Sequence, residues 1–108
     1  MDEVQSGSTP WIVDRSAADD PRLVLKFATL TGEGISHSLD RIEVDERDDE
    51  VRIAVIQTLR LPTGGYSWVT FPAYVDVTLR QPLGDRRLVH EPIAAHFADL
   101  QPSDPGRA

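Results

Sequence analysis

The sequence predicts an all-β fold, a small antiparallel β-sandwich or open barrel with at most one short helix near the C-terminal end. Apolar and polar residues alternate over several separate stretches, which is the pattern of strands with one buried face. Turn residues interrupt these stretches about every eight to twelve residues, as they do in sandwiches and barrels. With 40% hydrophobic residues, the 108-residue chain can bury one modest core, so a single domain is expected.

The ends of the chain are expected to lie outside this domain. Residues 1–10 are acidic and polar and are predicted to form a flexible tail, and residues 101–108 are predicted to form a second one. The β domain then spans residues 11–100. Its first segment, residues 11–14, either adds a short strand or anchors the tail by burying Trp11.

The first long strand is predicted over residues 22–30. Its apolar residues Leu23, Leu25 and Phe27 recur at every second position and therefore share one face. Two glycines in residues 31–37 then break the alternation and indicate a loop.

Residues 38–46 and 51–61 are predicted to pair as an antiparallel hairpin, joined by a charged turn over residues 47–50. The second of these strands carries apolar residues on both faces, because Ala54 and Ile56 alternate with its main apolar set. We therefore expect it to be central and to be covered on both sides at its middle.

A further strand is expected within residues 73–83, where Val75, Val77 and Leu79 point inward. A Pro-Gly turn follows it. A short last strand is then predicted over residues 87–90.

Residues 91–100 have a different spacing of apolar residues. Pro92 suits the first position of a helix, and Ile93, Phe97 and Leu100 recur at the spacing of one helical face. This pattern predicts a short helix, with an extended segment as the alternative.

Two stretches carry a resemblance. SLDRIEVDERDDEVRIAV (residues 38–55) and VDVTLRQPLGDRRLVH (residues 75–90) resemble segments of small β-rich domains in actinobacterial secreted proteins and lipoproteins. The most specific part is PLGDRRLV, residues 82–89. The resemblance covers about half of the chain and implies a β-rich fold, but no activity, because the function of that group is unknown. Many of its members carry a signal sequence and a pair of cysteines, and this chain shows neither.

The PLGDRR motif is suited to structure. Pro82 can begin a turn, and Gly84 can adopt a positive φ. Asp85 can bind backbone amides, and Arg86 or Arg87 can clamp a carboxylate. The motif contains no nucleophile.

Charge and cysteine content exclude several functions. The net charge of −7 argues against nucleic acid and an anionic membrane as partners, since both need a basic face. The expected partner is a protein or a second copy of the chain. The absence of cysteine excludes disulfides, thiolate catalysis and cysteine-ligated zinc. The start of the chain shows no signal peptide, which predicts a cytoplasmic location as written and an extracytoplasmic one only if the chain has been trimmed.

Patterns for catalysis and metal binding are weak. The three histidines, His37, His90 and His96, are scattered along the chain, so neither a metal site nor a cofactor is expected. Ser36, His37 and Asp40 hold the groups of a nucleophilic triad, but they lack the elbow motif that exposes such a serine. The chain is therefore not expected to be an enzyme.

Residues 62–71, PTGGYSWVTF, concentrate the aromatic side chains Tyr66, Trp68 and Phe71. In an extended segment Tyr66 and Trp68 share one face and Phe71 lies on the other, so both faces are apolar. One face can enter the core. The other needs a cover from the C-terminal segment, from Trp11, from a second copy or from a partner. These three aromatic residues are the candidate contacts for a protein partner, because Tyr and Trp are favoured interface anchors.

The predicted function is a non-catalytic protein-interaction or accessory module, with self-association through residues 62–71 as one form of it. The first alternative is a small acidic inhibitor or immunity-type protein, which requires a contiguous acidic face. The second is an enzyme or metal-binding domain around His37, which requires a concave pocket that holds a histidine and a carboxylate.

Overall fold

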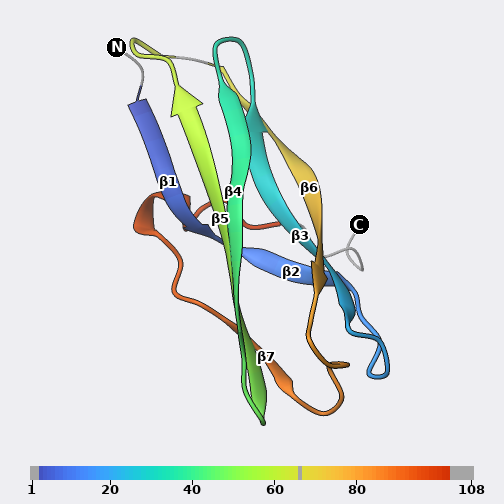
Figure 1. The fold of residues 1–108 in the computed structure, drawn as a ribbon. Coiled ribbons are helices and arrows are strands. Elements are labelled where there is room, and N and C mark those ends of the chain that lie inside the picture. Colours follow the sequence, from blue (N-terminus) through green and yellow to red (C-terminus); the bar gives the residue numbers. More distant parts are fainter. Residues whose placement is uncertain (1–2, 66, 103–108) are drawn as a thin grey trace.

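The computed structural model describes residues 3–65 and 67–102, which fold into two β-sheets (Figure 1). In chain order the described elements are β1 (Glu3–Thr9), β2 (Trp11–Arg15), β3 (Arg22–Thr31), β4 (Ser36–Glu46), β5 (Glu50–Leu61), β6 (Val69–Thr78), β7 (Arg87–His90) and the 3₁₀ turn η1 (Ala95–Phe97). The fold is all-β and sandwich-like, as predicted, and over the described residues the sheets remain open and form no barrel.

The N-terminal strands join the two sheets along one side. The first sheet has the order β1–β5–β4, and β7 pairs with β5 beyond the end of β1. The second sheet has the order β2–β3–β6. Neighbouring strands are antiparallel except for β5 and β7. Only Pro10 separates β1 from β2, so the chain passes between the sheets at that point, and β4 and β6 are the last strands of the two sheets at the opposite side.

The main core lies between the inner faces of β3 and β5. The alternating residues of β3 were predicted to share one face, and they do, against the matching face of β5. The buried members of this cluster are Trp11, Leu23, Leu25, Phe27, Val51, Ile53, Val55, Val77 and Leu79. The indole Nε1 of Trp11 donates a hydrogen bond to the carbonyl oxygen of Ile53 at 3.1 Å, which fixes the ring between the sheets.

A second cluster lies at the other end of the sandwich, where the C-terminal segment covers the strand ends. Its buried members are Ala28, Leu30, Leu59, Leu61, Phe97 and Leu100. Phe97 is completely buried, so the segment after β7 is an integral part of the fold.

The predicted hairpin is formed by β4 and β5. A β-bulge at Asp40 shifts the register between Leu39 and Arg41. The prediction that the second strand is covered on both sides is also correct, because Ala54 and Ile56 on its outer face are buried.

The prediction of a flexible tail over residues 1–10 is wrong for Glu3–Thr9, which form β1 and pair along β5. The side chains of this strand show no pattern of a buried face, because the strand buries few apolar residues and Val4 is exposed. β1 is ordered mainly through its backbone, because the central strand β5 has a second edge whose N–H and C=O groups need hydrogen-bond partners.

Two further boundaries differ from the prediction. The strand expected within residues 73–83 begins earlier, at Val69, and ends at Thr78, so it includes the end of the aromatic stretch. The helix expected over residues 91–100 is reduced to the single turn η1. The first part of that segment is extended because its backbone binds the first sheet, as in the hydrogen bond from Glu91 N to Ile53 O at 3.1 Å. No helix in the described residues is long and apolar enough to cross a membrane.

The PLGDRR motif works as its chemistry indicated. Gly84 has a φ of +60°, which a residue with a side chain rarely adopts. The Arg86 guanidinium donates to the carbonyl oxygens of Pro82 and Leu83 at 2.9 and 3.1 Å. It also donates to the Glu46 carboxylate at 3.3 Å, which is the predicted clamp and ties the end of β4 to the loop after β6.

Candidate functional site

Trp68 lies beside an apolar hollow at the end of the sandwich that the C-terminal segment covers. Its side chain is half exposed, at 53%. The hollow has a volume of about 280 Å³. Its apolar lining consists of Leu30, Leu59, Leu61, Trp68, Phe97 and Leu100, and its polar lining consists of Gln5, Thr70, His96 and Asp99. Since the leucines and Phe97 are buried, they form a floor, and Trp68 forms an accessible wall.

The floor depends on a close approach between β1 and the C-terminal segment. A Cβ atom placed on Gly7 would lie 2.8 Å from the Cβ of Ala94, so the absence of a side chain at Gly7 lets the segment reach the strand. The backbone N–H of Ala94 donates to Ser8 O at 2.9 Å, and His96 Nε2 lies 3.2 Å from Ser6 O. These contacts place Phe97 under the hollow.

Phe71 lies on a different surface. Thr70 and Phe71 are adjacent in β6, so their side chains leave opposite faces of the strand, and only Thr70 lines the hollow with Trp68. The ring of Phe71 is half buried and meets the ring of His37 edge to face, with the ring centroids 5.1 Å apart. His37 belongs to β4, so this contact bridges the two sheets.

The structure thus separates the predicted contact residues. Trp68 lines the hollow, and Phe71 lies at the open side between β4 and β6. Tyr66, the third candidate, lies outside the described residues. Next to Trp68, Val69 is 64% exposed, which extends the accessible apolar surface along the chain.

The acidic residues of β4 form ion pairs with two arginines, Arg41 in the strand and Arg47 just after it. Arg41 contacts Asp40 at 2.8 Å and Glu43 at 3.7 Å, and Arg47 contacts Asp45 at 2.9 Å. All of these side chains are exposed, so each ion pair adds little stability. Their main effect is to interrupt the acidic surface of the hairpin with positive charge.

Among the described residues, Glu46 and Arg52 have shifted pKa values. Burial would raise the pKa of Glu46, but hydrogen bonds from the backbone N–H of Arg80 and from Arg86 outweigh it, and the pKa lies below its ordinary value. Glu50 accepts a hydrogen bond from Arg52 and raises the pKa of that guanidinium. The Glu46 carboxylate ties the end of β4 to the loop after β6, whereas the Glu50 carboxylate bonds Arg52 within β5, and neither lines the hollow.

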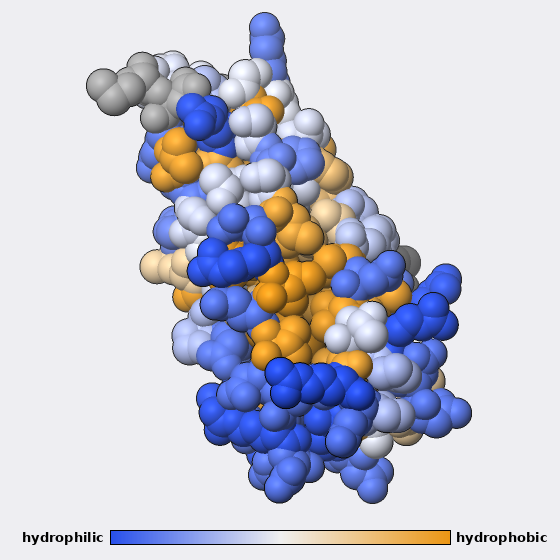
Figure 2. Space-filling view, viewed as in Figure 1, coloured by the Kyte–Doolittle hydropathy of each residue, from blue (hydrophilic) through white to orange (hydrophobic). Residues whose placement is uncertain are grey.

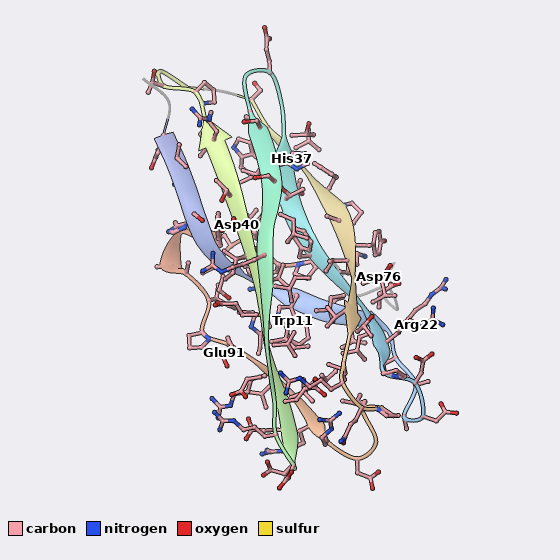
Figure 3. All side chains as sticks on the ribbon, viewed as in Figure 1. Trp11, Arg22, His37, Asp40, Asp76 and Glu91 are labelled. Atoms are coloured by element: carbon pink, nitrogen blue, oxygen red, sulfur yellow. The ribbon has the colours of Figure 1, made fainter. Side chains whose placement is uncertain are left out.

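The histidines lie at three separate places. His37 meets Phe71, His90 stacks on Trp11 with the ring centroids 4.5 Å apart, and His96 lies beside Ser6. Among the described residues, no three His, Asp or Glu side chains gather in a way that could hold a metal ion. Figure 3 shows His37 near the upper end of β4 and Asp40 farther down the strand. The Asp40 carboxylate accepts a hydrogen bond from Arg41 at 2.8 Å.

The hollow itself was not predicted. Leu30, Leu59 and Leu61 are apolar residues near strand ends, and the alternation within each strand does not show that they meet. The sequence does offer the C-terminal segment as one possible cover for an apolar face of residues 62–71. In the structure, Phe97 of that segment packs on the leucines beneath Trp68.

Comparison with known proteins gave no match to a family model, to a curated protein or to a solved structure. The resemblance to actinobacterial domains therefore stays a prediction.

Proposed function

We propose that this chain is a non-catalytic protein-interaction module that binds a partner protein through the hollow beside Trp68. The observation that carries the proposal is a half-exposed tryptophan next to an apolar floor of buried leucines and Phe97. Tryptophan is among the residues most enriched in binding hot spots, especially where neighbouring groups exclude water.

The size of the hollow favours a side chain of a partner protein, and not a small-molecule ligand, as its occupant. Its volume of about 280 Å³ falls just below the range of about 300–1,000 Å³ that is usual for ligand pockets. One apolar side chain of a partner could lie against Trp68 and over Leu59. The polar lining residues Gln5, His96 and Asp99 could then hydrogen-bond to the partner around that anchor.

The test is affinity capture from the native host, with wild-type protein, Trp68→Ala and Val4→Ala in parallel. Val4 is a matched control, because its exposed fraction is the same as that of Trp68, 53%, and it lies on β1 outside the lining of the hollow. We expect a partner that wild type and Val4→Ala retain and that Trp68→Ala loses. A set of captured proteins that is the same for all three would overturn the proposal.

Analytical ultracentrifugation of the same proteins distinguishes the form of the interaction. A wild-type dimer that Trp68→Ala converts to a monomer would make the partner a second copy of the chain. A monomeric wild type, together with a captured protein, would make it a different protein.

A further inference from the structure

The sandwich is open along the side where β4 and β6 lie. Within the part of the chain that the structure describes, each of these strands has a neighbour on one side only, β5 for β4 and β3 for β6. Two contacts connect them across the gap. The Phe71 and His37 rings meet at one end, and Arg80 N donates to the Glu46 carboxylate at 2.8 Å at the other.

Apolar side chains lie between these two contacts. Leu39 is paired with Gln57, Ile42 with Val55 and Val44 with Ile53, so the β4 residues face inward with those buried partners. Ala73 and Val75 of β6 are paired with Phe27 and Leu25 and also face inward. Leu39 and Val44 are 43% and 39% exposed, and the other three are half buried. We call Leu39, Ile42, Val44, Ala73 and Val75 the open slot.

Figure 2 shows a hydrophobic area in the middle of the same view, with hydrophilic residues crowded below it. Cross-sheet contacts close a sandwich core from solvent, and here the partly buried side chains of Ile42, Ala73 and Val75 pack directly on the main core. The open slot is therefore a continuation of the core that reaches the surface.

No strand of the described residues pairs with the backbone of β6 on the side of the slot. Leu79 N donates to Pro21 O at 2.8 Å, and in an antiparallel pair such bonded positions alternate with unbonded ones. With the register of β3 and β6, even-numbered residues from Thr70 to Thr78 therefore turn their N–H and C=O groups away from β3. Pro72 is one of these even-numbered residues, so its lack of an N–H group removes no hydrogen bond to β3. Within the described residues, no hydrogen-bond acceptor pairs with the backbone N–H groups of Tyr74 and Asp76.

The two edges differ in how they are protected. β4 carries the charged residues Arg41, Glu43 and Asp45 on its outer face, a common protection of an edge strand against pairing with another chain. In contrast, residues 68–75 contain no charged side chain. An added strand would therefore pair with β6.

The charge of the protein restricts what can add there. A second copy would bring another net charge of −7, together with its own charged β4 edge, to the same side of the sandwich. Along the outward face of β6 itself the one charged side chain is Asp76, and the register places Lys26 and Arg22 of β3 diagonally beside it. An incoming strand with basic outward residues would complement the net charge of −7, and apolar residues at alternate positions would fit the open slot.

We propose that the open side receives an extended segment of another protein, with alternating apolar and basic residues, which pairs with the free edge of β6 and places its apolar side chains in the open slot. This mode is strand addition to a sheet edge, in which backbone hydrogen bonds give affinity and alternate side chains give specificity. Of the residues that line the hollow beside Trp68, this site uses Thr70 alone, so it can be tested independently of the proposed function.

The probe is a synthetic peptide of alternating Val and Lys, long enough to pair with residues 70–78. A peptide of the same composition with all Val before all Lys is the control for charge alone. Binding is followed by NMR titration of the amide signals. We expect the alternating peptide to shift the signals of Tyr74 and Asp76 and to bind at least about tenfold more tightly than the block peptide. Equal binding of both peptides, or binding of neither, would overturn the proposal.

Tyr74→Pro and Tyr74→Ala test the backbone contact. Both remove the tyrosine side chain, but only proline removes the outward N–H, and neither removes a bond to β3. We expect the affinity of Tyr74→Pro for the alternating peptide to be about tenfold lower than that of Tyr74→Ala. Equal affinities in two folded variants would show that the β6 edge is not the contact.

Leu39→Arg keeps the proposal testable if Tyr74→Pro does not fold. The new guanidinium would enter the slot where the valines of the peptide are expected and would put a charge against them, so the alternating peptide should bind about tenfold more weakly. Val4→Arg is the matched control, because it adds the same charge at an exposed position on β1. Trp68→Ala should leave peptide binding unchanged. Loss of binding in Trp68→Ala but not in Leu39→Arg would assign the peptide to the hollow and overturn the strand-addition site.

Discussion

The side-chain amide of Gln57 donates a hydrogen bond to the carbonyl oxygen of Ala28 at 3.0 Å, across the two sheets. The register of β2 and β3 places Phe27 opposite Trp11, so Ala28 lies opposite Pro10, which has no N–H to offer. Gln57 supplies the donor that the proline lacks. The same Nε2 also donates to Thr9 Oγ1 at 2.8 Å, so one buried glutamine secures the point where the chain changes sheets.

Replacement of this amide should destabilise the protein. Gln57→Leu would leave the Ala28 carbonyl buried without its donor, which costs about 1–3 kcal/mol. The measurement is the free energy of unfolding in urea. Gln81→Leu, a change at an exposed glutamine, serves as the control and should lie within about 0.5 kcal/mol of wild type. A Gln57→Leu variant as stable as wild type would show that the hydrogen bonds at the crossover are dispensable.

The difference between a buried core residue and the half-exposed Trp68 gives a second prediction. Ile53 is fully buried between the sheets, so Ile53→Ala should lower the free energy of unfolding by about 2–5 kcal/mol. Trp68 is half exposed, so Trp68→Ala should cost clearly less stability. Urea denaturation of both variants measures the difference. Equal losses would show that Trp68 is an ordinary core residue and would remove the main support for the proposed binding surface.

The strands of the core could be predicted because the alternation of apolar and polar side chains shows which face of each strand is buried. Leu23, Leu25 and Phe27 alternate strictly, and a one-residue error would have turned them all to solvent. β1 could not be predicted in this way. Its residues are mostly small and polar, and it is ordered by backbone pairing with β5, which no side-chain pattern records. The bulge at Asp40 escaped prediction for the same reason.

The candidate site was predictable only in part. Alternation correctly placed Trp68 and Phe71 on different faces, because that depends on local geometry alone. Whether either face is exposed depends on which strands become edges and on where the C-terminal segment packs. Both are properties of the whole topology. The exposed fraction of Trp68 and the open slot therefore required the structure.

The two tryptophans should differ in their response to a quencher. Trp11 is 7% exposed and is held by its hydrogen bond to Ile53 O, whereas Trp68 is 53% exposed. Acrylamide should therefore quench one emitting population readily and the other weakly. Trp68→Phe should remove the readily quenched population and leave the protected one. A Trp68→Phe variant whose remaining emission is still readily quenched would contradict the burial of Trp11.

His90 should be needed for the position of Trp11. Its Nε2 accepts a hydrogen bond from the backbone N–H of Trp11 at 2.9 Å, and its ring stacks on the indole. His90→Phe keeps a flat ring but removes the acceptor, so it should lower the free energy of unfolding by about 1–3 kcal/mol. His96→Phe, at the exposed contact with Ser6, is the comparison and should cost less. The reverse order of the two variants in urea denaturation would show that the stacked ring, and not the acceptor, matters at position 90.

The carboxylate of Glu46 should make the stability depend on acid pH. Its pKa in the folded protein lies below the ordinary value of 4.5, because hydrogen bonds from Arg80 N and Arg86 outweigh the effect of burial. A lowered folded-state pKa gives stability that is fully present above the unfolded-state pKa and is lost as the pH falls through the folded-state value. Glu46→Gln should therefore cost about 1–3 kcal/mol near neutral pH, and its difference from wild type should shrink below about pH 4.5. A double-mutant cycle with Arg86→Ala, measured by urea denaturation at both pH values, isolates the pair. A coupling energy that stays the same from neutral to acid pH would show that the charge of Glu46 does not contribute to the clamp.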